Sequence, residues 1–282
     1  MLPSFEYVAF NDLNKALDFL TEHENVKPIA GGTDLVVQMR ARKIVPQYVA
    51  DIEEIPDLRY IQEEDGALRL GALTKIEDLR RSEIVRRYAP SLWLAAQEFA
   101  TWQVRNVATL GGNLSNASPA ADTATPLIAL GAKAVVKSRK GERTISLDEF
   151  FRGPGITSMR PDELLVEVVV PIEEAKHNFI KLGKRATHVL SIVNVALMLK
   201  LEGEVVKDIR IALGAVAPTP VRARSAEEAL KGKAISPSLA REAASKVIKD
   251  ISPISDVRAT REYRQEMSNV LTFRAIKEVM GW

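Results

Sequence analysis

The sequence contains no cysteine and only three histidines, His23, His177 and His188, among its 282 residues. Without cysteine the chain forms no disulfide, offers no thiol nucleophile and binds no Cys-ligated zinc ion or iron–sulfur cluster. The histidines are scattered along the chain without i,i+4 spacing, so we expect no metal site. Any redox chemistry of this chain must therefore come from an organic cofactor, because its side chains offer no redox couple.

The sequence also lacks an excess of charge of one sign and any long apolar run. A net charge of +2, with no basic run beside aromatic residues, argues against nucleic acid as a partner. The longest apolar stretch, 192–201, includes Asn194 and Lys200 and is too short for a membrane span. The first twenty residues carry charges throughout and do not match a secretory signal, so we expect a cytoplasmic protein.

What the chain does contain is two short runs of small residues, 30–35 and 109–114, each with a pair of glycines. A glycine pair lets backbone N–H groups approach a ligand closely, because no Cβ stands in the way. Successive N–H groups that point inward form a concave anion site. One such pair is most often only a tight turn, but two pairs in one chain favour the diphosphate of a dinucleotide such as FAD.

Polar side chains accompany both glycine pairs. The Thr33 hydroxyl and the side chains of Thr109 and Asn113 are candidate donors to phosphate, whereas Asp34 is better suited to ribose hydroxyls or backbone N–H groups. The polar segment 103–124 is predicted to be a long functional loop. At its end, Asp122 is predicted to lie in the first turn of a helix. There it either accepts hydrogen bonds from a ribose or simply complements the helix dipole.

The order of predicted elements indicates an α+β protein with two domains. Asn11 is expected to cap the first helix, and a strand over 26–30 leads into the first glycine pair. Further on, a hairpin over 193–201 and 205–215 precedes two helices. The last helix, 260–280, is expected to bury a stripe of Tyr263, Met267, Val270, Leu271 and Ala275. The boundary between the domains is placed at 171–176.

Several segments together resemble the FAD-binding medium subunit of the molybdenum hydroxylases, the family of carbon monoxide dehydrogenase, aldehyde oxidoreductase and xanthine dehydrogenase. The resemblance covers essentially the whole chain. Its two strongest parts are the runs 28–35 and 103–114, which are similar to the family's two FAD loops. The other parts are 116–122, 151–155, 161–165 and 256–264. The resemblance implies an FAD-binding fold of the vanillyl-alcohol-oxidase (PCMH) type. It assigns 1–172 to the FAD-binding domain, with subdomains of about 1–55 and 56–172, and 176–282 to an α+β C-terminal domain.

The resemblance also assigns residues to the cofactor. The loops 29–35 and 109–113 would hold the FAD diphosphate, and Asn116 and Asp122 would face the adenosine ribose or the diphosphate. Phe99 would pack near the adenine, Leu165 would lie on the strand beside the flavin, and Lys181 would precede the loop over the isoalloxazine. The complete set is Ile29, Ala30, Gly31, Gly32, Thr33, Asp34, Leu35, Phe99, Thr109, Gly111, Gly112, Asn113, Asn116, Asp122, Leu165 and Lys181.

Two departures from the family's pattern are visible. Many relatives have His or Gln with Ser where this chain has Thr33 and Asp34. Others carry an aromatic or acidic residue over the flavin, where this chain has Thr187-His188-Val189-Leu190. A histidine there is more often packed or solvated than catalytic, so no catalytic residue is predicted.

The function implied is electron transfer. A large partner subunit would carry molybdopterin, a small one two [2Fe–2S] clusters, and FAD on this chain would pass their electrons to an external acceptor. A dimer of heterotrimers is expected. The absence of cysteine also excludes the subfamily whose flavin subunit carries an inserted cluster. The alternatives are a stand-alone FAD-dependent oxidoreductase that acts on its own small substrate, and a nucleotide-binding scaffold that has lost its flavin.

Overall fold

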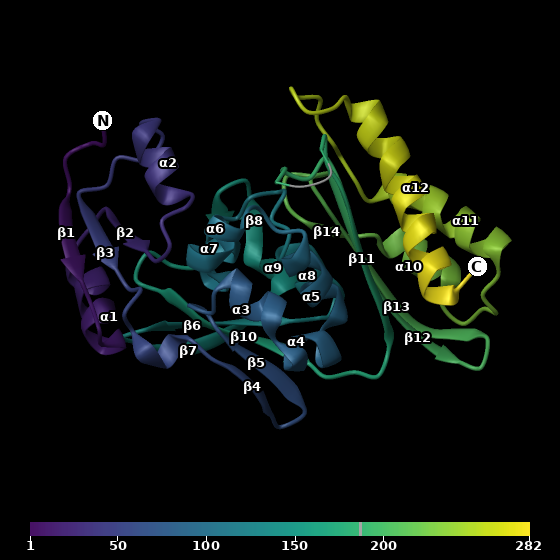
Figure 1. Cartoon of the computed structure of the whole chain (residues 1–282), viewed down its shortest axis with the longest axis horizontal. Helices are drawn as coiled ribbons and strands as arrows, with labels where there is room; N and C mark the ends of the chain where they lie inside the picture. Colours follow the sequence, from purple (N-terminus) through teal and green to yellow (C-terminus); the bar gives the residue numbers. More distant parts are fainter. Residues whose placement is uncertain (186–187) are drawn as a thin grey trace.

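Three larger β-sheets and one two-stranded sheet form the computed structural model, which describes residues 1–185 and 188–282 (Figure 1). Ala186 and Thr187 lie outside the described residues, and with them the first position of the run 187–190. In Figure 1 the small N-terminal sheet is at the left, the central sheet lies below the central helices, and the C-terminal sheet stands upright at the right.

The N-terminal sheet is parallel, with the strand order β1-β3-β2, and α1 and α2 follow its first two strands. Its elements are β1 (Glu6–Ala9), α1 (Leu13–Glu22), β2 (Val26–Ile29), α2 (Leu35–Arg40) and β3 (Tyr48–Asp51). The predicted strand before the first glycine pair is confirmed as β2. The expected cap of α1 is wrong by one residue, because the Asp12 carboxylate, and not Asn11, accepts the Lys15 N–H at 2.9 Å.

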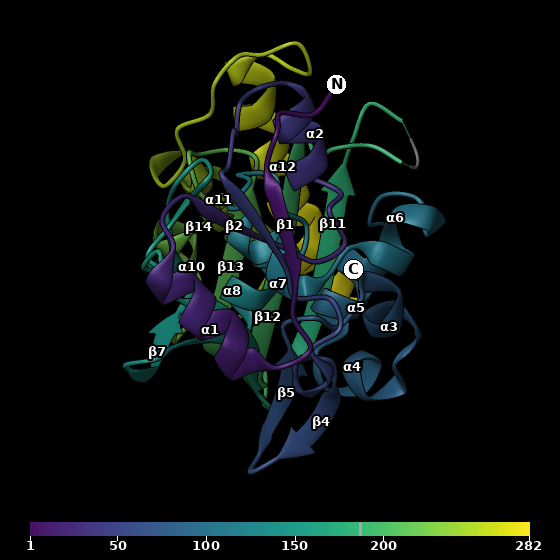
Figure 2. The same ribbon diagram turned by 90° about the vertical axis from the view of Figure 1, so that its left-hand side faces the viewer.

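The central sheet is antiparallel, with the order β4-β5-β10-β6-β7, and helices cover one of its faces (Figures 1 and 2). Its strands are β4 (Ile61–Glu64), β5 (Ala67–Gly71), β6 (Lys133–Ser138), β7 (Gly141–Ser146) and β10 (Leu164–Pro171). The helices on that face are α3 (Ile76–Arg81), α4 (Glu83–Tyr88), α5 (Pro90–Gln97), α6 (Trp102–Val107), α7 (Leu110–Ser115), α8 (Ala124–Ala129) and α9 (Leu147–Phe150), and β8 (Phe151–Gly153) pairs with β9 (Ile156–Thr157). The short helix η1 (Pro56–Leu58) packs instead with α1 and with Val135 and Val166 of the sheet.

The predicted loop over 103–124 is wrong, because most of its first half forms the short helices α6 and α7. Each begins at a threonine whose hydroxyl accepts a backbone N–H, from Val104 at Thr101 and from Gly112 at Thr109. These caps stabilise two helices that the small residues of the segment do not predict. Asp122 lies just before α8, whose N-cap is Thr123, and not in its first turn.

The C-terminal sheet is antiparallel, with the order β11-β12-β13-β14. One face lies against α5 and α8, and the other is covered by α10, α11 and α12 (Figure 1). The elements are β11 (Lys176–Leu182), β12 (Val193–Glu202), β13 (Val205–Gly214), β14 (Val221–Arg222), α10 (Arg224–Leu230), α11 (Pro237–Ser245), η2 (Lys246–Lys249) and α12 (Arg261–Met280). The predicted hairpin is confirmed as β12 and β13.

The stripe expected on the last helix is partly wrong. Tyr263 is exposed, and α12 buries Arg264, Ser268 and Thr272 beside Leu271 and Ala275. The helix therefore inserts a charged side chain and two hydroxyls into the protein, which a search for apolar periodicity cannot find.

The two halves of the chain share a core. The hydrophobic cluster above the central sheet is built mainly from α3, α5, α7 and α8, and it also includes Phe179, Ala196 and Ala212 from the C-terminal sheet. A separate cluster lies between the C-terminal sheet and its own helices. The inner face of the C-terminal sheet thus serves as one wall of the core of the first half.

Candidate cofactor-binding site

The first glycine loop presents a row of unpaired backbone donors. It joins β2 to α2, and the N–H groups of residues 31–35 donate no hydrogen bond within the part of the chain that the structure describes. Unpaired N–H groups in succession form an anion-binding concavity. The Thr33 hydroxyl has no hydrogen-bond partner among the described residues either, so the loop offers side-chain and backbone donors together.

Gly31 allows this loop to pack against the chain that precedes the second glycine pair. A Cβ at Gly31 would lie 1.9 Å from the carbonyl oxygen of Val107 and 3.0 Å from the nitrogen of Ala108. Gly32 adopts φ of +66°, a conformation that other residues rarely take. The first glycine is needed for the close approach of the two loops, and the second for the turn.

The second glycine pair has a different role, because its backbone N–H groups are already used. The Gly111 N–H donates to the Ala72 carbonyl at 2.8 Å, and the Gly112 N–H donates to the Thr109 hydroxyl at 3.0 Å. A Cβ at Gly111 would lie 2.7 Å from the Cβ of Ala72. What this segment still offers a ligand is the Asn113 amide nitrogen, since the Asn113 oxygen accepts the Thr123 hydroxyl at 2.6 Å.

Side-chain hydrogen bonds tie the two loops into one site. The Gln38 amide on α2 donates to Oδ1 of Asn116 at 2.8 Å. Lys75 Nζ donates to the Val107 carbonyl at 3.2 Å and to Glu53 Oε1 at 2.6 Å. The structure therefore brings 29–35 and 109–116 side by side, although about eighty residues separate them along the chain.

Asp34 stands at the edge of the first loop. Its side chain accepts no capping hydrogen bond from α2. Surrounding protein raises the pKa of its carboxyl above the ordinary value through desolvation. A carboxylate in this position is available to hydroxyl donors of a ligand.

Asp122 and Lys181 meet at the junction of the two halves. Lys181 Nζ lies 2.6 Å from Asp122 Oδ2, and Asp122 Oδ1 accepts the Ser191 hydroxyl at 2.6 Å and the Asn194 amide at 3.0 Å. The Asn194 oxygen in turn accepts the Thr125 hydroxyl at 2.8 Å. The Asp122 carboxylate thus already holds three donors from the C-terminal half, and a contact to ribose, which stays a prediction, would have to be added to them.

The turn after α5 lies beside this ion pair. Lys181 Nζ also donates to the Glu98 carbonyl at 3.1 Å. Arg105 donates to the carbonyls of Phe99 at 2.9 Å and Ala100 at 3.3 Å, which holds Ala100 at φ of +38°. Desolvation raises the pKa of the Glu98 carboxyl above its usual range, an effect that Lys181 opposes. Phe99 and Leu165, both predicted near the cofactor, are buried in the first core.

Several residues of this region carry no local sequence signal. Ser191 and Asn194 were not among the predicted site residues, because both reach the site from the C-terminal half. Arg105 lies within the run 103–114, but nothing in the sequence indicated that its side chain holds the turn after α5. A buried asparagine or serine within an apolar run, such as Asn194 in β12, is the only available hint.

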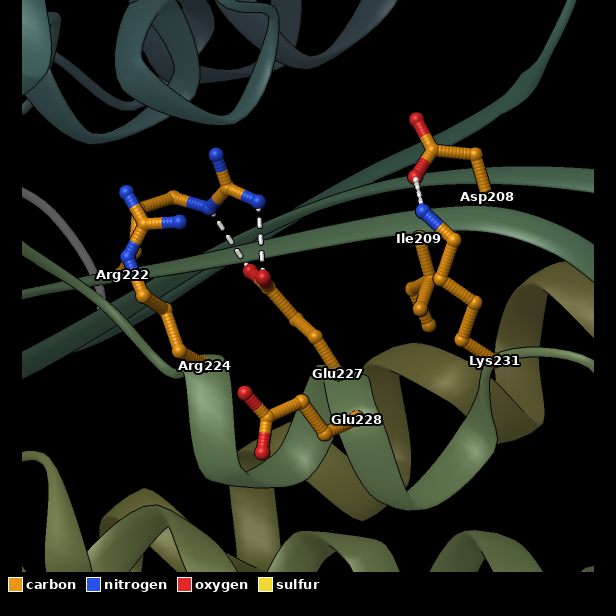
Figure 3. Close-up of a pocket in the computed structure, with 7 residues that line it drawn as sticks. All are labelled: Asp208, Ile209, Arg222, Arg224, Glu227, Glu228 and Lys231. Carbon is orange, nitrogen blue, oxygen red and sulfur yellow. Dashed lines mark hydrogen bonds and ion pairs between the residues drawn. The ribbon is translucent and has the colours of Figure 1, made fainter.

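A charged pocket lies elsewhere, between β13, β14 and α10 (Figure 3). Its cations are already paired with carboxylates, Arg222 with Glu227 at 2.7 Å, Arg224 with Asp148 at 3.1 Å and Lys231 with Asp208 at 3.3 Å. Paired in this way, they leave no spare charge for an anionic ligand.

Comparisons with known proteins agree with this geometry. Residues 3–173 match the family described as FAD binding domain in molybdopterin dehydrogenase, and residues 178–279 match the CO dehydrogenase flavoprotein C-terminal domain. This chain belongs to the FAD-binding medium subunits of the molybdenum hydroxylases. The sequence-based prediction of family and fold class is thereby confirmed.

Relatives of this medium subunit match it over nearly the whole length. The glyceraldehyde dehydrogenase medium chain of Sulfolobus acidocaldarius is 36% identical, over 98% of this chain and 99% of that protein. The carbon monoxide dehydrogenase medium chain of Hydrogenophaga pseudoflava is 34% identical, over 97% of this chain and 96% of that protein. Each is a named subunit of a dehydrogenase, so this chain is a flavoprotein subunit of an oxidoreductase complex.

Solved structures give the same result. Carbon monoxide dehydrogenase from Hydrogenophaga pseudoflava aligns with a TM-score of 0.96 at 34% identity and covers 100% of this chain and 99% of that one. Quinoline 2-oxidoreductase from Pseudomonas putida 86 aligns with a TM-score of 0.94 at 29% identity, over 100% of this chain and 99% of that one. Across residues 1–185 and 188–282, no helix has the length and apolar character that crossing a membrane requires.

Proposed function

We propose that this medium subunit takes electrons from [2Fe–2S] clusters on a partner subunit and passes them through FAD to an external acceptor. The observation that carries the proposal is the row of unpaired N–H groups at residues 31–35, packed through Gly31 against the second loop. A diphosphate supplies the acceptors that such a row lacks. When bound, FAD would accept electrons and pass them on singly or in pairs.

In this proposal the residues of the chain bind and orient the cofactor. The backbone of 29–35 holds the diphosphate, with the Thr33 hydroxyl and the Asn113 amide as further donors. Asp34 is available to ribose hydroxyls, and Asn116 extends the polar wall. Asp122 and Lys181 position the C-terminal half against the cofactor, and the proposed division of the chain at 172–176 places one half on each side of it.

The partners are proposed from the same family. A large subunit would hold molybdopterin and oxidise the organic substrate, and a small subunit would hold two [2Fe–2S] clusters. Two such heterotrimers would associate. The chain itself has no cysteine with which to ligate a cluster, which is consistent with clusters on another subunit. A cytoplasmic location stays a prediction.

The test is the visible spectrum of the chain, alone and co-purified with its partner subunits. We expect flavin absorbance in the complex, and bleaching by candidate organic substrates only when the partners are present. Bleaching of the lone subunit by a substrate would favour a stand-alone oxidoreductase. A lone chain and a complex that both lack flavin, even after incubation with FAD, would leave only a scaffold function.

A further inference from the structure

The segment 256–264 is part of the family resemblance, but none of its residues belongs to the proposed FAD site. Its last residue, Arg264, lies on the second turn of α12 and is 2% exposed. Nη1 of Arg264 donates to the carbonyls of Ile192 at 2.6 Å and Ala215 at 2.8 Å, and Nη2 donates to Asp256 Oδ1 at 2.8 Å. One guanidinium therefore joins the start of β12, the end of β13 and the loop before α12.

Both carbonyls held by Arg264 belong to segments that contact the FAD-binding half. Ile192 stands between Ser191, which donates to Asp122 at 2.6 Å, and the strand residue Val193 that leads to Asn194. Ala215 donates its own N–H to the Pro119 carbonyl at 2.7 Å and adopts φ of +65°. Such a backbone conformation persists only where its surroundings hold it, and here Arg264 bonds to the Ala215 carbonyl and Pro119 to the Ala215 N–H.

Asp256 completes the arrangement by holding the loop before α12. Its Oδ1 accepts the backbone N–H groups of Arg258 at 2.8 Å and Ala259 at 3.2 Å, as well as Nη2 of Arg264. The loop presents Val257, 91% exposed, and the half-exposed Arg258 to solvent. Displacement of Arg264 would therefore remove the hydrogen bond that ties Asp256 to α12, and with it loosen this loop and the segments that face Asp122.

We infer that Arg264 is the positioning residue for the C-terminal wall of the FAD site: it fixes Ser191 and Asn194 against Asp122. This inference rests on the proposed binding of FAD between the two halves. Only a guanidinium presents several donors in a fixed planar fork, so lysine, a single flexible ammonium, cannot hold both carbonyls and Asp256 at once.

The test uses Arg264→Lys in the full-length chain, with Arg261→Lys as the matched control because Arg261 is exposed one turn earlier on the same helix. We expect Arg264→Lys to weaken FAD binding about tenfold, equivalent to about 1.4 kcal/mol. It should also alter the visible circular dichroism of the flavin at saturating FAD, and speed tryptic cleavage after Arg258. Arg261→Lys should match the wild type in all three measurements.

A double-mutant cycle separates positioning from a general loss of stability. If Arg264 acts through Ser191, the effects of Arg264→Lys and Ser191→Ala on FAD binding should not add. The double variant should then bind FAD no more weakly than the weaker-binding of the two single variants. Additive effects, or a lowered melting temperature with wild-type dichroism and affinity, would overturn the inference. A wild-type chain that binds no FAD would refute the proposed function instead, while the proteolysis comparison would still report on the loop.

Discussion

The ammonium of Lys181 lies 2.6 Å from the carboxylate of Asp122, and the two side chains are only 3% and 8% exposed. They come from β11 and from the segment before α8, so the ion pair joins the two halves of the subunit. Breaking a buried pair leaves one charge without compensation, which costs far more than the intact pair contributes.

Lys181→Met is therefore expected to lower the free energy of unfolding by about 3 kcal/mol, and Asp122→Asn by a similar amount. The double variant should lose less than the sum of the two, because no buried charge remains uncompensated. Urea denaturation of the FAD-free chain measures all three. Lys140→Met, which breaks the pair with Asp162 at a side chain that is 73% exposed, should cost less than about 1 kcal/mol. Additive losses would contradict this account.

Gly31→Ala is expected to abolish the retention of FAD. The added Cβ would lie 1.9 Å from the Val107 carbonyl oxygen, which belongs to the backbone and cannot rotate away as a side chain would. The two loops must then separate. The measurement is the ratio of flavin to protein absorbance after purification. Gly153→Ala is the control, since the nearest atom to its added Cβ is 3.9 Å away. A wild-type flavin ratio in Gly31→Ala would remove this loop from the proposed site.

Glu77 should make the protein sensitive to acid. The hydrogen bond from Arg80, followed by those from Arg105 and Arg81, holds the pKa of its buried carboxyl at about 2 against the effect of desolvation. Because this pKa is depressed in the folded state, the stabilisation is present above pH 4.5 and is lost as the pH falls through about 2. Glu77→Gln should remove that part of the acid dependence. It should also loosen Arg105, which holds the turn at Ala100. A profile of urea midpoints between pH 5 and 3 that is as steep in Glu77→Gln as in the wild type would count against this account.

His177 should make the stability of the protein depend on pH in a higher range than Glu77 does. Burial lowers its pKa from 6.5 to about 4, an effect that Glu173 opposes. As the pH falls below 6.5, His177 becomes protonated in the unfolded chain but stays neutral in the folded one. The free energy of unfolding therefore decreases until about pH 4. His177→Gln should flatten the profile of urea midpoints between these values. An equally steep profile in the variant would mean that other groups cause the change.

Much of the fold was predictable from local patterns. The hairpin of β12 and β13 is two long runs around Gly203, and the strand before the first glycine pair is short and bounded by that pair. The helices α6 and α7 were missed because small residues and threonine caps form them, not apolar periodicity. Tyr263 was misplaced because α12 buries Arg264 instead, and an arginine in a sequence normally indicates a surface position.

The glycine loops of the site were predictable from the sequence, but the side-chain bonds that join distant segments of the site were not. A glycine pair indicates that something approaches the backbone closely. At Gly31 that neighbour is the backbone at Val107, which the sequence did not indicate. Asp122 was predicted from its place after the polar segment as well as from the family resemblance, and Lys181 from the resemblance alone. Nothing local indicated that they bond to each other across 59 residues. Such pairings depend on how the sheets pack, which no short segment encodes.

The shared core has a consequence for how the subunit is made. Phe179, Ala196 and Ala212 close the core of the first half, yet they are synthesised only after all of its own strands and helices. Chains fold from the N-terminus as they leave the ribosome. Until residue 212 emerges, the nascent first half keeps the apolar sides of α5 and α8 open to water. A fragment ending after β10 should therefore aggregate, and loading with FAD should await a nearly complete polypeptide.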